Sequence, residues 1–216
     1  MATGRRVLTE TLSVNPETSE PLLTILERAE ELLATVEGCI KAGVGMVQLR
    51  EKSLADEELL ECARRLRELC AGTGTLFIVN DRPDIALLSH ADGVHLGQED
   101  LPLPQVRRLV GDRLLVGLST HSLEQARQAL REGADYIGAG PVFETATKDA
   151  GPLLGTEGLE EILREVELPV FAIGGIADSN VASVQAVGGG RVAVCSSVLA
   201  SASPGKIVEE LRSALA

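Results

Sequence analysis

The sequence predicts an α/β fold: a single (β/α)₈ or TIM barrel, with parallel strands inside and helices outside. From about residue 44 onward, short β-branched apolar runs alternate with longer amphipathic segments, which is the pattern of βα units around a parallel sheet. The chain has 216 residues, of which 44% are hydrophobic, so it can bury the core of one barrel. We therefore expect one domain over residues 1–216, with residues 1–20 as a candidate N-terminal arm.

Seven apolar runs are the candidate strands. In chain order they are residues 44–50, 75–80, 93–97, 114–120, 135–140, 169–175 and 190–196. An eighth strand must close the barrel near the N-terminus, and two positions fit it, 22–26 and a run within 7–14. Residues 30–41 are expected to be helical in either case. The looser stretches 15–21 and 144–158 are expected to be loops.

Helix signals lie between the candidate strands. Ser53 is the expected N-cap of a helix whose apolar residues follow at three- and four-residue spacing. Ser122 followed by Gln125 forms a capping-box pattern that predicts another helix start. Asp178 is the expected cap of a later helix, and Pro204 opens the last one.

Composition excludes several classes of function. The chain carries 20 basic and 32 acidic residues, a formal charge of −12, which disfavours binding to nucleic acid or to anionic membranes. Aromatic residues make up 2%, too few for base-stacking platforms. The four cysteines have no C-x-x-C spacing, which favours free thiols over structural zinc. The start resembles no secretion signal and no stretch has membrane-spanning length, so we expect a cytoplasmic protein.

Polar residues follow the predicted strands at their carboxyl ends, where TIM-barrel enzymes place their active sites. Arg50, Lys52 and Lys148 are cations on an acidic chain, and they predict a pocket for a multiply charged anion such as a diphosphate. Asp81 and Asp100 suit Mg²⁺, which commonly uses one or two carboxylates together with phosphate oxygens and water. The sequence therefore predicts Mg²⁺ between protein and substrate.

The ends of the last two predicted strands indicate a second anion site. Residues 173–176 and 195–197 each lead from a strand toward a helix. Glycines at such a place let backbone N–H groups approach a phosphate, and barrels often bind phosphate after strands seven and eight. We expect a second, smaller phosphate site there.

Each of these residues also has a purely structural interpretation. Taken alone, Asp81 is better explained as a helix cap, and the charged run 50–52 as a solvated surface. His95 lies inside an apolar run and is interpreted as an interior group rather than a base. The joint occurrence of the charged residues at strand ends favours a phosphate-handling site over these explanations.

Five motifs, in order, resemble the thiamine-phosphate synthase family. They lie at residues 48–52 (QLREK), 79–82 (VNDR), 93–100 (GVHLGQED), 140–148 (GPVFETATK) and 172–176 (AIGGI). The resemblance implies a TIM-barrel transferase. It would join 4-amino-2-methyl-5-hydroxymethylpyrimidine diphosphate to 4-methyl-5-(2-hydroxyethyl)thiazole phosphate, or to its carboxylated form. Pyrophosphate would leave in a dissociative, Mg²⁺-assisted substitution.

The same resemblance implies a role for each matching residue. The catalytic residues would be Arg50, Lys52, Ser119 and Lys148. Mg²⁺ would be bound by Asp81 and Asp100. The pyrimidine diphosphate would be held by Gln48, Arg50, Lys52, Asn80, Ser119 and Lys148. The thiazole phosphate would be held by Thr145, Thr147, Gly175, Cys195 and Ser196.

Two other functions stay open on the sequence. A thiazole tautomerase would share the barrel and the thiazole-phosphate site, but it would lack the full diphosphate and metal set. A non-catalytic regulatory barrel would bind thiazole or thiamine phosphate and act through partners. The expected partners are small-molecule substrates, and neither nucleic acid nor a membrane is expected to bind. Whether the protein forms a homo-oligomer is left open.

Overall fold

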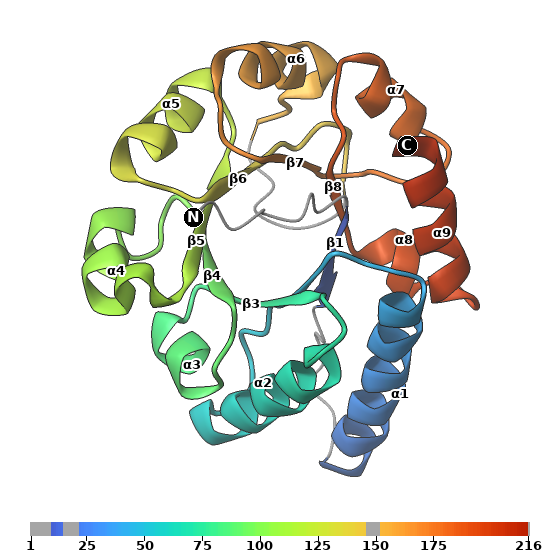
Figure 1. The fold of residues 1–216 in the computed structure, drawn as a ribbon. Coiled ribbons are helices and arrows are strands. Elements are labelled where there is room, and N and C mark those ends of the chain that lie inside the picture. The colour runs from blue at the N-terminus through green and yellow to red at the C-terminus, as the bar shows by residue number, and fades with distance from the viewer. Residues whose placement is uncertain (1–9, 15–21, 146–151, 216) are drawn as a thin grey trace.

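The computed structural model describes residues 10–14, 22–145 and 152–215. Eight parallel strands close into a barrel in chain order, and the last strand pairs with the first. Figure 1 shows the helices as an outer ring around these strands. The predicted (β/α)₈ barrel is therefore confirmed, while the assignment of the whole of residues 1–216 to one domain stays a prediction.

All seven predicted strands are present, and an eighth, near the N-terminus, completes the barrel. The strands are β1 (Glu10–Val14), β2 (Met46–Leu49), β3 (Leu76–Asn80), β4 (Gly93–Leu96), β5 (Leu115–Thr120), β6 (Tyr136–Ala139), β7 (Val170–Ile173) and β8 (Val192–Val194). Of the two positions considered for the first strand, the one within 7–14 is right. The run 22–26 belongs to a helix, and residues 10–14, which fall within the expected arm, are a strand of the barrel.

The helices that follow the strands form the outer layer. They are α1 (Leu22–Lys41), α2 (Asp56–Cys70), α3 (Pro83–Leu88), α4 (Leu103–Val110), a 3₁₀ turn η1 (Gly111–Arg113), α5 (Leu123–Glu132), α6 (Gly155–Glu165), α7 (Val181–Ala186), α8 (Ser196–Leu199) and α9 (Pro204–Leu215). Because α6 begins at Gly155, the predicted loop 144–158 ends earlier than expected. In the described part of the chain, no helix is both long and apolar enough to cross a bilayer.

Two of the predicted helix caps are wrong. The N-cap of α2 is Ala55, whose N–H donates to the Glu58 carboxylate at 3.2 Å, whereas the Ser53 hydroxyl donates to Glu51. The N-cap of α7 is Asn180, not Asp178, and its side-chain oxygen accepts from the backbone of the preceding turn. In both cases another side chain satisfies the backbone near the helix start, so the nearest Ser or Asp is not needed there.

Ser122 caps α5 as predicted, although the Gln125 side chain completes the start by accepting from the His121 N–H and not from the Ser122 N–H. The Ser122 hydroxyl accepts a hydrogen bond from the Gln125 N–H at 3.3 Å. We expect Ser122→Ala to lower the free energy of unfolding by about 1 kcal/mol, because this N–H loses its acceptor. Ser53→Ala is the matched control and should change it by less than about 0.5 kcal/mol. Urea unfolding measures both, and equal losses would contradict the cap at Ser122.

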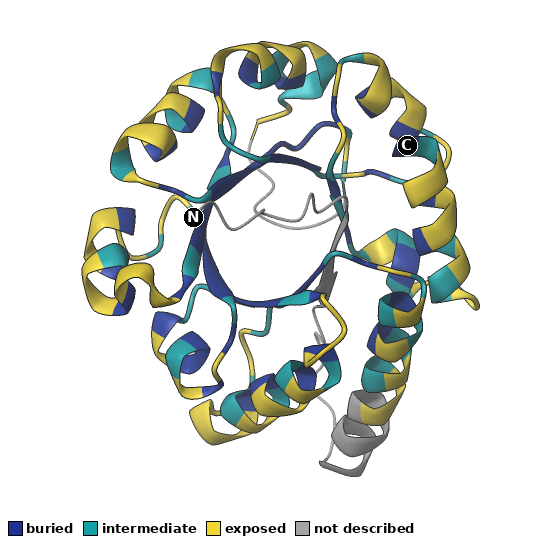
Figure 2. Ribbon diagram, in the orientation of Figure 1, coloured by how far each residue is buried: buried dark blue, intermediate teal, exposed yellow. Residues whose placement is uncertain are grey.

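The core has two layers, because successive strand residues face opposite sides of the sheet. Figure 2 shows buried residues along the strands and on the inner faces of the helices. One cluster packs strand residues such as Val47 and Phe77 against helix residues such as Leu66. A smaller cluster faces the barrel interior and comprises Met46, Ile78, Tyr136 and Phe171. The next inward positions along these strands therefore form the carboxyl-end rim of the barrel.

Candidate active site

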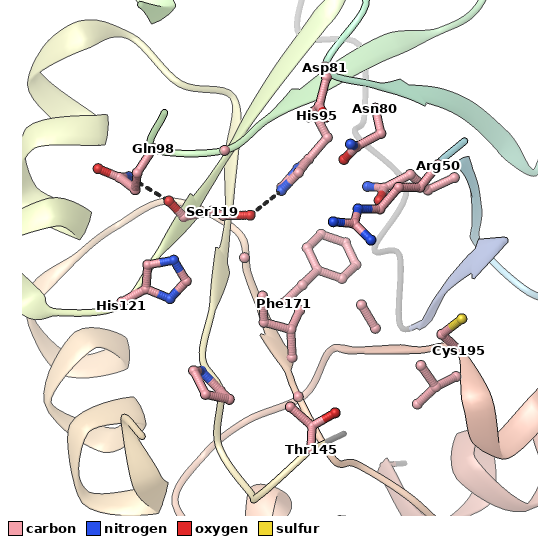
Figure 3. Close-up of a pocket in the computed structure, with 18 of the residues that line it drawn as sticks. Arg50, Asn80, Asp81, His95, Gln98, Ser119, His121, Thr145, Phe171 and Cys195 are labelled. Carbon is pink, nitrogen blue, oxygen red and sulfur yellow. Dashed lines mark hydrogen bonds between the residues drawn. The ribbon is translucent and has the colours of Figure 1, made fainter. Parts of the chain in front are cut away.

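A cavity of about 830 Å³ opens at the carboxyl ends of the strands, within the usual size range of ligand pockets. Figure 3 shows its lining, with side chains from several strands converging on one space. The described members of the predicted site all line it, namely Gln48, Arg50, Lys52, Asn80, Asp81, Asp100, Ser119, Thr145, Gly175, Cys195 and Ser196. Thr147 and Lys148 lie outside the described residues.

The alternation of strand residues explains why these side chains meet. On β2, Met46 faces the interior, so Gln48 and then Arg50 follow on the same side, two residues apart. On β3, Ile78 is likewise followed by Asn80 at the rim. A polar residue placed two positions after an inward apolar one is thereby carried to the mouth of the barrel.

Arg50 is the cation best placed for an anionic ligand. Figure 3 shows its guanidinium directed into the cavity. Burial raises the pKa of both Asp81 and Cys195, and the positive charge of Arg50 counteracts each rise, so the guanidinium lies near both sides of the cavity. Among the described residues it forms no salt bridge, whereas Arg82 and Arg107 are each paired with aspartate. A planar guanidinium in this position suits bidentate recognition of phosphate oxygens.

Two carboxylates, Asp81 and Asp100, lie together at the rim. Burial, followed by the hydrogen bond and charge of Asp100, raises the pKa of Asp81 from an ordinary 3.8 to about 6. Lys52, whose ammonium lies 3.6 Å from the Asp81 carboxylate, counteracts this rise. A pair of oxygen ligands that repel each other fits a divalent cation, and Mg²⁺ would complete its shell with phosphate oxygens and water.

Asp81 is held through its backbone, and Asp100 is held through its carboxylate. Asp81 has a positive φ of 61°, a conformation that Asp tolerates better than most residues, and its N–H donates to the His95 carbonyl at 2.8 Å. It does not cap α3, because the N-cap there is Arg82. Asp100 accepts a hydrogen bond from the Gly97 N–H at 2.6 Å, which orders the turn after β4. The cap interpretation of Asp81 is therefore wrong.

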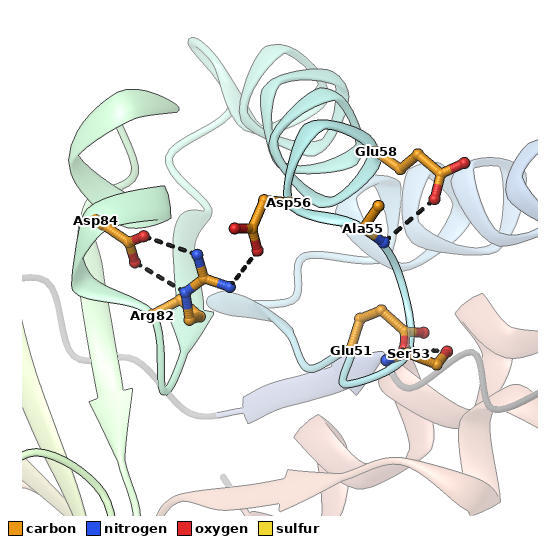
Figure 4. Close-up of polar contacts among 7 residues, drawn as sticks. All are labelled: Glu51, Ser53, Ala55, Asp56, Glu58, Arg82 and Asp84. Carbon is orange, nitrogen blue, oxygen red and sulfur yellow. Dashed lines mark hydrogen bonds and ion pairs between the residues drawn. The ribbon is translucent and has the colours of Figure 1, made fainter.

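Arg82 ties together the loops that carry Lys52 and Asp81. Its guanidinium binds Asp56 at the start of α2 at 2.8 Å and Asp84 in the first turn of α3 at 2.7 Å (Figure 4). These hydrogen bonds raise the pKa of Arg82 and lower that of Asp84. Arg82 thus links the β2–α2 and β3–α3 loops outside the cavity, whereas Lys52 and Asp81 of the same loops line it.

Backbone turns form the opposite side of the cavity, after β7 and β8. Gly174 and Gly175 have φ of 89° and 65°, values that favour glycine. A Cβ on Gly174 would lie 2.5 Å from the side chain of Pro141, and one on Gly175 would lie 2.9 Å from Phe143 Cβ. Glycine is thus required for the β7–α7 turn to approach the segment after β6 that includes Thr145. The exposed backbone here suits the predicted phosphate site.

Hydrogen bonds hold Ser119, at the end of β5, from both sides. Its hydroxyl lies 2.9 Å from His95 Nε2, and its carbonyl accepts a bond from the Gln98 amide at 2.6 Å. Burial lowers the pKa of His95 to about 4, so the imidazole is neutral at pH 7 and is an interior group, as predicted. Tyr136 was not among the predicted site residues, yet it hydrogen-bonds to His95 and lines the cavity floor. The available signal was the alternation along β6, which puts Tyr136 on the same side as Gly138, another residue of the cavity lining.

Comparison with known proteins gives a consistent result. The family model described as thiamine monophosphate synthase matches residues 22–198. A thiamine-phosphate synthase of Moorella thermoacetica is 44% identical over 192 residues, covering 88% of this chain and 91% of that protein. One from Gloeobacter violaceus is 48% identical over 176 residues, covering 82% of this chain but 52% of that protein, so the chain spans about half the length of this relative.

Solved structures agree with the sequence matches. The thiamine phosphate pyrophosphorylase of Pyrococcus furiosus superposes with a TM-score of 0.85 at 36% identity, covering 96% of this chain and 95% of that one. A 3-hexulose-6-phosphate synthase superposes with a TM-score of 0.73 at 17% identity, which reflects the shared barrel fold alone. With the family model covering most of the chain, the protein belongs to the thiamine monophosphate synthase family.

Proposed function

We propose that this chain is a thiamine-phosphate synthase. It would join the aminopyrimidine diphosphate to the thiazole phosphate and release pyrophosphate. With the carboxylated form of the thiazole phosphate, it would release CO₂ as well. The observation that carries the proposal is the convergence of Arg50, Lys52 and Asn80 with the Asp81–Asp100 pair on one cavity. Cations and paired carboxylates together are the groups needed to bind a diphosphate linked to Mg²⁺. The names of the relatives at 41–48% identity support the same activity.

The substrates divide between the two sides of the cavity. Gln48, Arg50, Lys52, Asn80 and Ser119, together with Lys148, would hold the pyrimidine diphosphate on the side of β2 to β5. The thiazole phosphate would lie on the opposite side, held by Thr145, Thr147, Gly175, Cys195 and Ser196. A cytoplasmic location stays a prediction, and a homo-oligomeric state stays open.

The reaction would need electrostatic stabilisation more than proton transfer. The bond between the pyrimidine methylene carbon and the diphosphate oxygen breaks, and its electron pair leaves with the diphosphate. The aminopyrimidine ring delocalises the positive charge left on the carbon, and the thiazole nitrogen then forms the new C–N bond with its own lone pair. Mg²⁺, when bound, would neutralise charge on the departing oxygens. Arg50 and Lys52 would bind that same group in a partly buried cavity, where charge stabilisation is strongest.

Turnover with pure substrates tests the proposal. We expect thiamine phosphate and pyrophosphate to appear in equal amounts when both substrates and Mg²⁺ are present, and neither product with one substrate or with chelator. Isomerisation of the carboxylated thiazole phosphate without coupling would indicate a tautomerase instead. Tight binding of thiazole phosphate without any turnover would indicate a regulatory barrel. Either of these last results would overturn the proposal.

A further inference from the structure

A buried chain of hydrogen bonds lies behind the Ser119 hydroxyl and crosses three neighbouring strands. His95 Nε2 on β4 lies 2.9 Å from the Ser119 hydroxyl on β5, and His95 Nδ1 lies 3.1 Å from the Tyr136 hydroxyl on β6. His95 and Tyr136 are 7% and 5% exposed. Figure 3 shows the Ser119 end of this chain at the wall of the cavity. The mechanism proposed above gives neither aromatic residue a role.

Glycine at position 117 makes the chain possible. The strand register places His95, Gly117 and Tyr136 in one row across β4, β5 and β6. A Cβ on Gly117 would overlap the Tyr136 ring and would lie 2.6 Å from His95 Nδ1. The histidine and tyrosine therefore meet over a residue that has no side chain. Phe171 packs edge-on against Tyr136, with ring centroids 5.6 Å apart, and holds the phenol in place.

Both rings are neutral at pH 7. Burial lowers the pKa of His95 to about 4 and raises the pKa of Tyr136 above its ordinary value. The imidazole thus carries one N–H, either on Nδ1 or on Nε2, and the phenol carries one O–H. Which ring nitrogen bears the hydrogen decides the direction of every hydrogen bond in the chain.

The surroundings of Tyr136 select one direction. In the described part of the chain, the hydroxyl of Tyr136 has a single hydrogen-bond partner, His95. If Nδ1 carried the hydrogen, the phenol would accept it and its own buried O–H would lack an acceptor, which costs about 1–3 kcal/mol. The phenol therefore donates to Nδ1, and Nε2–H donates to the Ser119 oxygen. That oxygen is occupied as an acceptor, so the Ser119 hydrogen is left to donate into the cavity.

We propose that His95 and Tyr136 are positioning residues that fix Ser119 as a hydrogen-bond donor toward an acceptor atom of the bound substrate. The inference rests on the proposed function for its catalytic consequence, but the direction of the chain is a property of the free protein. The atom that receives the bond is an electron-rich oxygen or ring nitrogen, since only an acceptor can pair with the directed hydroxyl. A substrate group that could only donate at this point would be disfavoured.

The isosteric Tyr136→Phe variant tests the catalytic consequence, because it removes only the phenolic oxygen. We expect it to lower kcat about tenfold, the effect of one misdirected hydrogen bond. In a Ser119→Ala background the same change should lower kcat less than twofold, because Tyr136 acts through the missing hydroxyl. A tenfold loss in both backgrounds would show that Tyr136 acts independently of Ser119, and it would overturn the proposal.

Nitrogen-15 NMR of the histidines, at pH 8 without substrate, tests the direction itself. We expect His95 to be protonated on Nε2 in the unaltered protein and to become a mixture of tautomers in Tyr136→Phe. His121 is the internal control, because its Nδ1 lies 2.6 Å from the Gly140 carbonyl and must donate to it. Its resonances should report the opposite tautomer and stay unchanged in a correctly folded variant. Protonation of His95 on Nδ1 in the unaltered protein would overturn the inference even if the protein has full synthase activity. Absence of turnover would instead overturn the proposed function.

Discussion

Replacing Arg50 by methionine is expected to lower kcat of the coupling reaction by about 100- to 1,000-fold, the range found when one preorganised charge-stabilising group is removed from an active site. Methionine keeps much of the length and apolar contact of the side chain but removes the guanidinium. That guanidinium faces the cavity and has no salt bridge within the described chain, so its charge is available to the leaving diphosphate. The loss should fall mainly on kcat, because the charge on the diphosphate oxygens grows as the C–O bond breaks.

Two further variants make the Arg50 test specific. Arg50→Lys keeps the charge without the planar, bidentate geometry, and it should recover only part of the lost rate. Lys41→Met removes an exposed cation at the end of α1, paired with Glu37 at 2.7 Å, and should leave kcat unchanged. Steady-state measurement of pyrophosphate release distinguishes the three. If Arg50→Met and Lys41→Met had equal rates, Arg50 would have no part in binding the diphosphate.

Replacing Asp81 by asparagine is expected to have opposite effects on turnover and on stability. Turnover should fall by at least about 100-fold, because a neutral amide is a poor ligand for Mg²⁺. The free protein should become more stable, because the substitution removes a carboxylate whose charge is disfavoured by burial and by the neighbouring Asp100. Asparagine also tolerates the positive φ of this position, so no new backbone strain offsets the gain.

The pH dependence gives the sign of the stability effect. Asp81 has a pKa of about 6 in the native state and about 4 when unfolded, so between these values the native state binds more protons. The free energy of unfolding therefore falls as the pH rises from about 4 to about 6. At pH 7.5 Asp81→Asn should recover about 1 kcal/mol, which raises Tm by about 2–4 °C, and below about pH 4 this gain should vanish.

Asp84 provides the matched control for Asp81. Its pKa is lowered by the hydrogen bond to Arg82, so its ionised form stabilises the native state at neutral pH. Asp84→Asn should thus lower Tm at pH 7.5, opposite in sign to Asp81→Asn. Calorimetry in the absence of Mg²⁺ measures both. A lower Tm for both variants would contradict the repulsion between Asp81 and Asp100.

The barrel could be predicted from the sequence because its strands are buried on both faces. Residues in β4 are buried at every position, and such strands appear as continuous apolar runs bounded by glycine and polar residues. The first strand was ambiguous because its sequence lacks such a continuous apolar run. Glu10–Val14 has the sequence ETLSV, in which polar residues alternate with apolar ones. It is a strand because it pairs with β2 on one side and with β8 on the other.

The residues of the site could be predicted from the sequence, but the contacts between their side chains could not. The order of residues along a strand places Gln48 and Asn80 at the rim, because the side-chain period is two. Contacts between strands depend on register, which the sequence does not state. The row that joins His95, Gly117 and Tyr136 exists only because β4, β5 and β6 pair at those positions. Two helix caps were predicted wrongly because Glu58 and Asn180, and not the expected Ser53 and Asp178, accept hydrogen bonds from the backbone there.

Calorimetric titration of pyrophosphate into the protein, with and without Mg²⁺, tests the central claim most directly. We expect tight binding only when Mg²⁺ is present, and at least tenfold weaker binding to both Asp81→Asn and Asp100→Asn. Ser53→Ala, which lies in the same loop as Lys52 but outside the cavity lining, should bind as the unaltered protein does. Equal affinity with and without Mg²⁺, or undiminished binding by the two asparagine variants, would contradict a magnesium-linked diphosphate site at the ends of β2 to β4.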